Sequence, residues 1–361
     1  MKAVVIREHG DLDVLRLEEL PEPEPGPGEV QIAVRAIGLN HLDTWVRRGV
    51  PGHTFPLPIV PGCDMSGVVT KLGAGVRHVT VGERVLVAPG ISCGRCRHCA
   101  QGEDPLCRDF GILGETCDGA CRELAVVPAQ NALPIPDGLD FVQAAAFPLT
   151  FLTAWHMLVA RCGIQPGDDV LVHAAGSGVG SAAVQIAKLF GARVLATAST
   201  DEKLERARAL GADVLIDYER TSFKQEVRAA TAKRGVDIVV EHVGERTIAD
   251  SIQCLAKGGR VVTCGATTGS RLETNLQLVF FKGLSILGST MGSRGELIRI
   301  VELVARGLLR PVVDRVLPLE QVREAHRALG AREQFGKIVL VTGATDPARS
   351  PPPTSPRRTG R

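Results

Sequence analysis

Residues 173–180, His-Ala-Ala-Gly-Ser-Gly-Val-Gly, connect a short apolar run, Asp169–Ala174, to a helical pattern over Gly178–Phe190. Glycines at such a strand-to-helix turn let backbone N–H groups approach a pyrophosphate, and the helix N-terminus adds partial positive charge. The stretch departs from G-x-G-x-x-G, since Ala175 and Ser177 occupy the first two glycine positions. Its context between strand and helix still predicts a phosphate-binding turn. The residues predicted to bind the cofactor in this turn are Ser177, Gly178, Val179 and Gly180.

Downstream of this turn, strands alternate with helices, which predicts right-handed βαβ units and a doubly wound parallel sheet. These units are followed by a helix over Glu296–Leu308 and by a stretch over Leu319–Val341, which ends in the strand Lys337–Val341. The predicted strands are Arg193–Thr197, Val214–Ile216, Val236–Glu241, Gly259–Cys264 and Leu284–Leu287, and the predicted helices are Asp201–Leu210, Phe223–Thr231 and Thr247–Leu255.

The end of the second strand of this sheet predicts the choice of cofactor. Sites that prefer NAD usually carry Asp or Glu there to hold the ribose 2′-hydroxyl. Ala198 stands at that position, so no carboxylate would repel a 2′-phosphate. Ser199, Lys203 and Tyr218 are candidates to bind one, which favours NADP(H) over NAD(H). The alternative is that Lys203 is an ordinary exposed lysine and that Asp201 takes the ribose.

Upstream of the turn, residues 1–145 are rich in short β patterns separated by Gly and Pro, as in PEPEPGPGE at 21–29. This spacing predicts an antiparallel barrel or sandwich with long loops. The predicted strands are Lys2–Arg7, Glu29–Ile37, Ser66–Lys71, Arg84–Ala88 and Glu123–Val127.

A cysteine cluster interrupts this β-rich part. Cys93, Cys96, Cys99 and Cys107 follow one another on a short Gly-bounded loop, at about 90–110. Four thiolates can close a tetrahedral zinc site, and four protein ligands leave no open position, so we predict one structural zinc. The spacing does not fit the bacterial ferredoxin run or a C-x-x-C-H haem site. The alternative is four unrelated thiols.

Composition bounds the class of protein. The chain has 361 residues, ten cysteines and a net charge of +2. Four arginines against one aspartate make residues 344–361 basic, so the rest is near neutral and we expect no nucleic-acid partner. That tail is predicted to be disordered. The first residues do not form a signal peptide, and the apolar stretch Phe141–Ile164 carries too many polar groups for a membrane span, so we expect a cytoplasmic protein without a membrane partner.

Together, the phosphate turn and the cysteine loop resemble the medium-chain dehydrogenase/reductase superfamily, which includes zinc alcohol dehydrogenases and quinone oxidoreductases. Further matching stretches are Val60–Gly67, Leu152–Trp155 and Gly258–Gly265. The resemblance implies a GroES-like β-barrel catalytic domain over 1–145, a Rossmann domain over 146–290 and a return to the catalytic domain over 291–343. It also implies a homodimer or homotetramer.

The catalytic zinc of zinc alcohol dehydrogenases is where this sequence departs from the family. The resemblance places Asn40 at the first ligand position, Cys63 at the histidine of the Gly-His-Glu turn, and Thr150 in the third region. A catalytic zinc normally has three protein ligands, and one thiol does not supply them. The motif Gly-Leu-Asn-x-x-Asp-Thr at 38–44 resembles that of the metal-free quinone oxidoreductases instead. The alternative is a displaced zinc site, because His41, Asp43, Cys63 and Asp64 are all residue types that bind zinc. Against it, His41 can hydrogen-bond locally, Asp43 can cap a helix and Cys63 can be a buried apolar side chain.

In a metal-free site, hydrogen-bond donors must stabilise the negative charge that develops on a carbonyl oxygen. Asn40 is the first candidate donor, His41 a candidate proton donor, and Thr153 resembles a residue that seats the nicotinamide. We also expect Val243 and Gly265 to contact the cofactor. The predicted function is reduction of quinones, enones or other carbonyl compounds with NADPH. The alternatives are a zinc-dependent alcohol dehydrogenase with atypical ligands, and an NADPH-binding sensor or RNA-binding protein without turnover.

Overall fold

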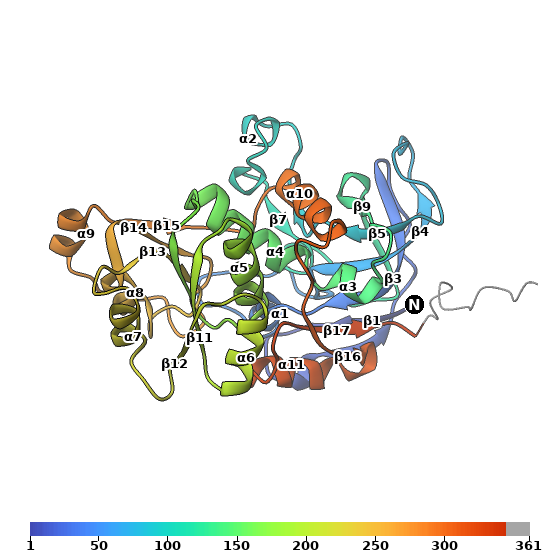
Figure 1. Cartoon of the computed structure of the whole chain (residues 1–361). Helices are drawn as coiled ribbons and strands as arrows, with labels where there is room; N and C mark the ends of the chain where they lie inside the picture. Colours follow the sequence, from blue (N-terminus) through green and yellow to red (C-terminus); the bar gives the residue numbers. More distant parts are fainter. Residues whose placement is uncertain (344–361) are drawn as a thin grey trace, which may run out of the picture.

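The computed structural model describes residues 1–343 and places two large sheets side by side (Figure 1). The tail that was predicted to be disordered, 344–361, lies outside the described residues. Within residues 1–343, no helix is long and apolar enough to cross a membrane.

The first large sheet is parallel throughout and contains six strands among the described residues, in the order β12-β11-β10-β13-β14-β15. Its central strand β10 has Val170, Leu171 and Val172 fully buried, as both faces of a parallel sheet require. This order confirms the predicted doubly wound sheet. Its strands are β10 (Asp169–Val172), β11 (Arg193–Ala198), β12 (Val214–Asp217), β13 (Val236–Glu241), β14 (Leu255–Thr263) and β15 (Ser285–Gly288).

The connections of this sheet are helical, as the alternating pattern predicts. Helix α5 packs on β10 and β11, and α8 packs on β13 and β14. Strand β14 begins at Leu255, earlier than the predicted Gly259, because the short helix before it ends at Gln253. The helices are α5 (Gly178–Leu189), α6 (Asp201–Ala209), α7 (Phe223–Ala230), α8 (Ile248–Gln253) and α9 (Leu276–Lys282).

The second large sheet is mostly antiparallel and centres on β3, which pairs with β4, β8 and β17. The strand β17 from the end of the chain thus joins a sheet built from its beginning, as Figure 1 shows by the red strand beside the blue ones. The strands are β3 (Glu29–Gly38), β4 (Asp64–Leu72), β5 (Arg84–Val87), β8 (Leu124–Pro128), β9 (Ala132–Pro134), β16 (Val313–Pro318) and β17 (Lys337–Val341).

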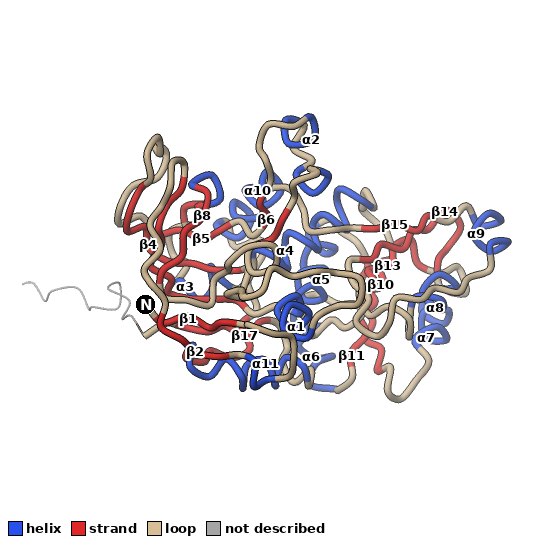
Figure 2. The backbone as a smooth tube through the Cα atoms, turned by 180° about the vertical axis from the view of Figure 1, so that it is seen from behind, coloured by secondary structure: helices blue, strands red, loops and turns tan. Residues whose placement is uncertain are grey.

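Shorter elements surround this sheet (Figure 2). Two small antiparallel pairs join β1 (Lys2–Val5) to β2 (Arg16–Glu19) and β6 (Gly90–Ile91) to β7 (Gly111–Ile112). The remaining helices are α1 (His41–Arg48), α2 (Arg97–Ala100), α3 (Phe141–Ala145), α4 (Pro148–Trp155), α10 (Arg294–Ala305) and α11 (Val322–Gly330), with single turns η1 (Leu12–Val14), η2 (Asp104–Leu106), η3 (Ala129–Asn131), η4 (His156–Arg161) and η5 (Leu319–Gln321).

Helix α4 packs against α5, and one continuous hydrophobic core runs from the antiparallel sheet into the parallel one. The two sheets are therefore held together by buried apolar contacts as well as by the chain. The predicted domain boundaries near residues 145 and 290 remain predictions.

Candidate functional site

A pocket of about 590 Å³ lies between the two sheets, at the carboxyl ends of β10, β11 and β13. Its walls come from α1, α4, the phosphate turn and the segments before α10 and β17. The crevice outside the carboxyl ends of the strands is where open α/β sheets bind their ligands. Most of the predicted site residues meet here: Asn40, His41, Thr153, Ser177, Gly178, Val179, Ser199, Lys203, Tyr218, Val243 and Gly265 all line the pocket.

The phosphate turn has the geometry that its sequence predicts. Ser177 is the N-cap of α5, and its hydroxyl accepts a hydrogen bond from the backbone N–H of Gly180 at 2.8 Å. A Cβ atom on Gly180 would lie 2.3 Å from the carbonyl oxygen of Ala174, so only glycine lets the turn close. Gly180 does not line the pocket itself. It shapes the turn, whereas Ser177, Gly178 and Val179 face the pocket.

Two cations, Lys203 and Arg332, and one carboxylate, Glu219, line the pocket near the end of β11. Lys203 lies on α6 and donates a hydrogen bond to the carbonyl oxygen of Arg332, and both residues line the pocket with Ser199 and Tyr218. Asp201, the alternative ribose ligand, is held by Arg220 in an ion pair of 3.0 Å. Arg332 was missed at the sequence level because it is far away in the chain and no local motif marks it.

A buried polar cluster lies under the pocket floor, where α1, β4 and β17 meet. The Lys337 ammonium donates to Asn40 Oδ1 at 2.6 Å and to Asp64 Oδ2 at 3.0 Å. The Asn40 amide in turn donates to Asp64 Oδ2 at 2.9 Å and to the carbonyl oxygen of Gly38 at 3.1 Å. These two bonds use both amide protons of Asn40, which leaves none for a substrate oxygen. The geometry therefore does not support the predicted donor role of Asn40.

Lys337 itself was missed by the sequence analysis. It begins an apolar strand and has no neighbouring motif, and only the pairing of β17 with β3 carries it to Asn40 and Asp64. Its side chain also lies beside the phosphate turn, because a Cβ atom on Gly178 would be 3.2 Å from Lys337 Cδ.

The residues of the proposed displaced zinc site have other roles. Asp43 forms a capping box with Asn40 at the start of α1, and its second oxygen accepts the backbone N–H of Gly62 at 3.1 Å. Burial raises the pKa of Asp43 to about 7 and raises the pKa of the Cys63 thiol well above its usual range. Asp43 and Cys63 do not line the pocket. Asp43 therefore caps helix α1, which is the alternative to a role as a zinc ligand.

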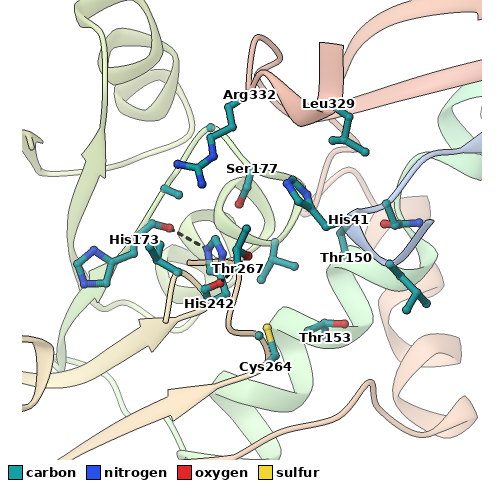
Figure 3. A pocket seen from close by; sticks show the side chains of 18 of the residues that line it. His41, Thr150, Thr153, His173, Ser177, His242, Cys264, Thr267, Leu329 and Arg332 are labelled. Atoms are coloured by element: carbon teal, nitrogen blue, oxygen red, sulfur yellow. Dashed lines mark hydrogen bonds between the residues drawn. The ribbon is translucent and has the colours of Figure 1, made fainter. Parts of the chain in front are cut away.

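Besides Asn40, two of the predicted catalytic residues line the pocket, His41 and Thr153. Figure 3 shows the His41 ring projecting into it on the same side as Ser177 and Arg332, whereas Thr153 and Cys264 lie at the other end. Burial, followed by the nearby charges of His242, Arg332 and Lys337, lowers the pKa of His41 to about 4. Its imidazole is therefore neutral at pH 7 and offers one N–H donor.

The four predicted zinc ligands converge away from the pocket. The sulfur atoms of Cys93, Cys96, Cys99 and Cys107 all lie within 4.8 Å of one another. Sulfurs bound to one tetrahedral zinc at about 2.3 Å stand roughly 3.8 Å apart, so the arrangement fits that ion. Backbone N–H groups of Arg95 and Cys96 lower the pKa of Cys93 to about 6, which favours the thiolate. Within residues 1–343, no other such group of His, Cys, Asp and Glu is found.

Comparisons with known proteins agree with this architecture. The chain matches the family described as alcohol dehydrogenase GroES-like domain over residues 26–137, and the family described as zinc-binding dehydrogenase over 178–306. The chain therefore belongs to the medium-chain dehydrogenase/reductase superfamily, and the predicted fold class is confirmed. It is an NAD(P)-dependent oxidoreductase of the type that includes alcohol dehydrogenases, quinone oxidoreductases and enoyl reductases.

Three similar proteins illustrate the range of names in the family. A 2-haloacrylate reductase of Burkholderia sp is 33% identical, with 95% of this chain and 99% of the relative covered. A quinone oxidoreductase of Pseudomonas aeruginosa is 32% identical, with 94% and 99% covered. The crystal structure of an NAD-dependent alcohol dehydrogenase is 51% identical and superimposes with a TM-score of 0.91, with 95% of this chain and 100% of that chain covered.

Proposed function

We propose that this protein reduces quinones, α,β-unsaturated carbonyl compounds or related carbonyls with NADPH, without a catalytic zinc. The observation that carries the proposal is the cluster of Asn40, Asp64 and Lys337. At the positions where the resemblance puts metal ligands, the chain offers a neutral amide and a buried thiol whose pKa is raised. The Lys337 ammonium within the same cluster repels a second cation.

The residues of the pocket would bind the two ends of the cofactor. Ser177, Gly178 and Val179 would hold the pyrophosphate of the dinucleotide at the N-terminus of α5. A bound nicotinamide would supply the hydride chemistry. Thr153 would help to seat the nicotinamide end, and the neutral His41 ring, which lies on the side of Ser177 and Arg332 (Figure 3), would donate a hydrogen bond to the pyrophosphate.

Lys203 and Arg332 support NADP(H) as the preferred cofactor, because both cations line the pocket with Ser199, and Asp201 is paired with Arg220. The name of the 51% identical relative favours NAD(H) instead. We expect Lys203→Ala and Arg332→Ala each to raise KM for NADPH by about tenfold or more and to leave KM for NADH nearly unchanged. Arg208→Ala on the same helix α6, which removes an exposed pair with Glu205, is the control. A wild-type enzyme that uses NADH as well as NADPH would contradict this preference.

The test of the reaction combines turnover with zinc analysis. We expect about one zinc per chain, NADPH oxidation with a panel of quinones and enones, and no oxidation of primary or secondary alcohols with either NAD⁺ or NADP⁺. About two zincs together with alcohol oxidation would overturn the proposal in favour of a zinc alcohol dehydrogenase. NADPH binding without turnover on either panel would favour a sensor.

His41→Phe separates two roles of that ring. Loss of this hydrogen-bond donor beside Ser177 is expected to raise the Kd for NADPH by about tenfold and to leave kcat nearly unchanged. His53→Phe, a half-exposed histidine outside the pocket walls, is the control. A kcat lowered by about 100-fold with an unchanged Kd would show instead that His41 is a proton donor to the substrate.

We also propose that two copies of the chain associate through β15 and α9. Strand β15 is an edge of the parallel sheet, so its outer backbone groups are open for pairing. Leu276, Phe280 and Phe281 on α9 are 73%, 63% and 74% exposed, and Ile286 on β15 is 42% exposed. Pairing of two β15 strands about a twofold axis would cover this surface and remove the open edge.

A further inference from the structure

The cysteine lobe, residues 90–110, makes a contact with the pocket side of the molecule. Asp104 lies between the ligands Cys99 and Cys107, in the turn η2. Its Oδ2 accepts the backbone N–H of Arg294, the first residue of α10, at 2.8 Å. Figure 1 shows the lobe with α2 beside α10. A carboxylate at this place satisfies one unpaired N–H of the helix and interacts favourably with its dipole.

The same helix end is tied to α4. Ser293 and Glu296 form a capping box, in which Glu296 Oε2 accepts the backbone N–H of Ser293 at 2.7 Å. Glu296 also binds His156 at 3.0 Å, directly after the last residue of α4. Since α4 carries Thr153 into the pocket, the start of α10 joins the lobe to two walls of the site.

The segment 289–293, which leads into α10, is one of those walls. Ser289 and Met291 line the pocket. Ser289 is 9% exposed, and its buried hydroxyl has no hydrogen-bond partner within residues 1–343. Met291 has a φ of 52°, a conformation that a non-glycine residue adopts only when its surroundings impose it. A Cβ atom on Gly292 would lie 2.6 Å from Leu152 Cδ1 on α4. The segment is therefore fixed from both sides, and its position follows that of α10.

The lobe has little structure of its own to fix Asp104. Its helix α2 has four residues, none of them buried, and η2 has three. Such short turns are not stable alone, so ligation of the four thiols is what would order the loop between Cys99 and Cys107.

We propose that Asp104 is a positioning residue: it transmits the order of the zinc lobe to the pocket wall 289–293 through the first N–H of α10. This rests on the proposed function only in taking this pocket as the cofactor site. The lobe then has a role in cofactor binding although no cysteine ligand touches the pocket.

The test removes this one hydrogen bond from either side. Asp104→Ala deletes the acceptor. Arg294→Pro deletes the donor and leaves the lobe untouched, because proline is well tolerated at the first position of a helix and Ser293 before it is already extended, with ψ of 156°. Arg294→Ala, which keeps the N–H, and Asp109→Ala, an exposed aspartate of the same loop region, are the matched controls.

Three measurements are made on the zinc-loaded, full-length variants: zinc per chain, hydrogen exchange of peptides covering 289–297, and the Kd for NADPH. We expect Asp104→Ala and Arg294→Pro to retain zinc, to exchange at least tenfold faster in 289–297 and to bind NADPH three- to tenfold more weakly. Asp104→Asn, which keeps an acceptor oxygen, should recover most of the loss, and both controls should match the wild type.

The proposal is overturned if Arg294→Pro retains zinc and shows wild-type exchange in 289–297 and wild-type Kd, whatever the fate of Asp104→Ala. None of these measurements needs a substrate. An enzyme that fails the quinone and enone panel but shows the expected changes would refute the proposed function and leave the role of Asp104 standing.

Discussion

At the scale of single residues, the pocket depends on a buried ion pair. Lys337 and Asp64 compensate each other at 3.0 Å, and each is almost fully buried. Removing one partner of such a pair leaves the other charge without compensation, which is far more costly than removing both. Asn40 joins this pair, because its Oδ1 accepts a hydrogen bond from Lys337 and its amide donates one to Asp64.

His326 on α11 gives a prediction about pH. It is 1% exposed, and within the described chain neither ring nitrogen has a hydrogen-bond partner. Burial, then the charges of Arg47 and Arg48, lowers the pKa of His326 to about 3. The unfolded imidazole takes up a proton below about pH 6.5, so this residue's contribution to stability is present above that pH and is lost as the pH falls towards 3.

We therefore expect the wild type to lose ~2 kcal/mol of its free energy of unfolding through His326 between pH 7.5 and pH 5. His326→Phe should lose that much less over the same range, as measured by urea unfolding at the two pH values. His78→Phe, the same substitution at an exposed histidine, is the control. Equal pH dependence of wild type and His326→Phe would show that the ring is not buried in its neutral form.

At the scale of elements, the N-terminus of α5 gives a second prediction. Because a Cβ atom on Gly180 would meet the Ala174 carbonyl at 2.3 Å, Gly180→Ala is expected to cost ~1–3 kcal/mol of stability and to weaken cofactor binding by tenfold or more. Gly295→Ala in the first turn of α10, where a Cβ atom has no neighbour closer than 3.8 Å, should instead be neutral or stabilising by up to ~1 kcal/mol. Thermal unfolding and NADPH titration of the two variants provide the comparison, and equal behaviour would contradict it.

The elements also show how far the sequence could predict the structure. The strand and helix patterns after Asp169 recur at close to their predicted bounds, because a parallel sheet buried on both faces imposes apolar runs that local spacing reveals. The convergence of the four cysteines could be predicted because these candidate zinc ligands lie within one loop. By contrast, Lys337, Arg332 and Asp104 act on segments far away in the sequence. Their roles arise from packing between elements, which a single sequence does not record.

At the scale of the whole molecule, the exposed surface of α9 and β15 predicts the oligomeric state. We expect a dimer at micromolar concentration by light scattering, and we expect Phe281→Glu to shift it towards a monomer because a charge would be buried in the contact. Val81→Glu replaces an equally exposed apolar residue, 62% exposed and outside this surface, and should leave the dimer intact. A wild-type chain that is monomeric would refute the contact.

The pairing of β17 with β3 also bears on how the protein is made. Lys337 belongs to β17 and Asn40 is the N-cap of α1, so most of the polypeptide must leave the ribosome before the two can meet. The six-stranded parallel sheet is complete at Gly288, so it can form while β17, the last partner strand of β3, is still being translated. Assembly of the pocket is therefore expected to be a late event in biosynthesis, after both sheets have largely formed.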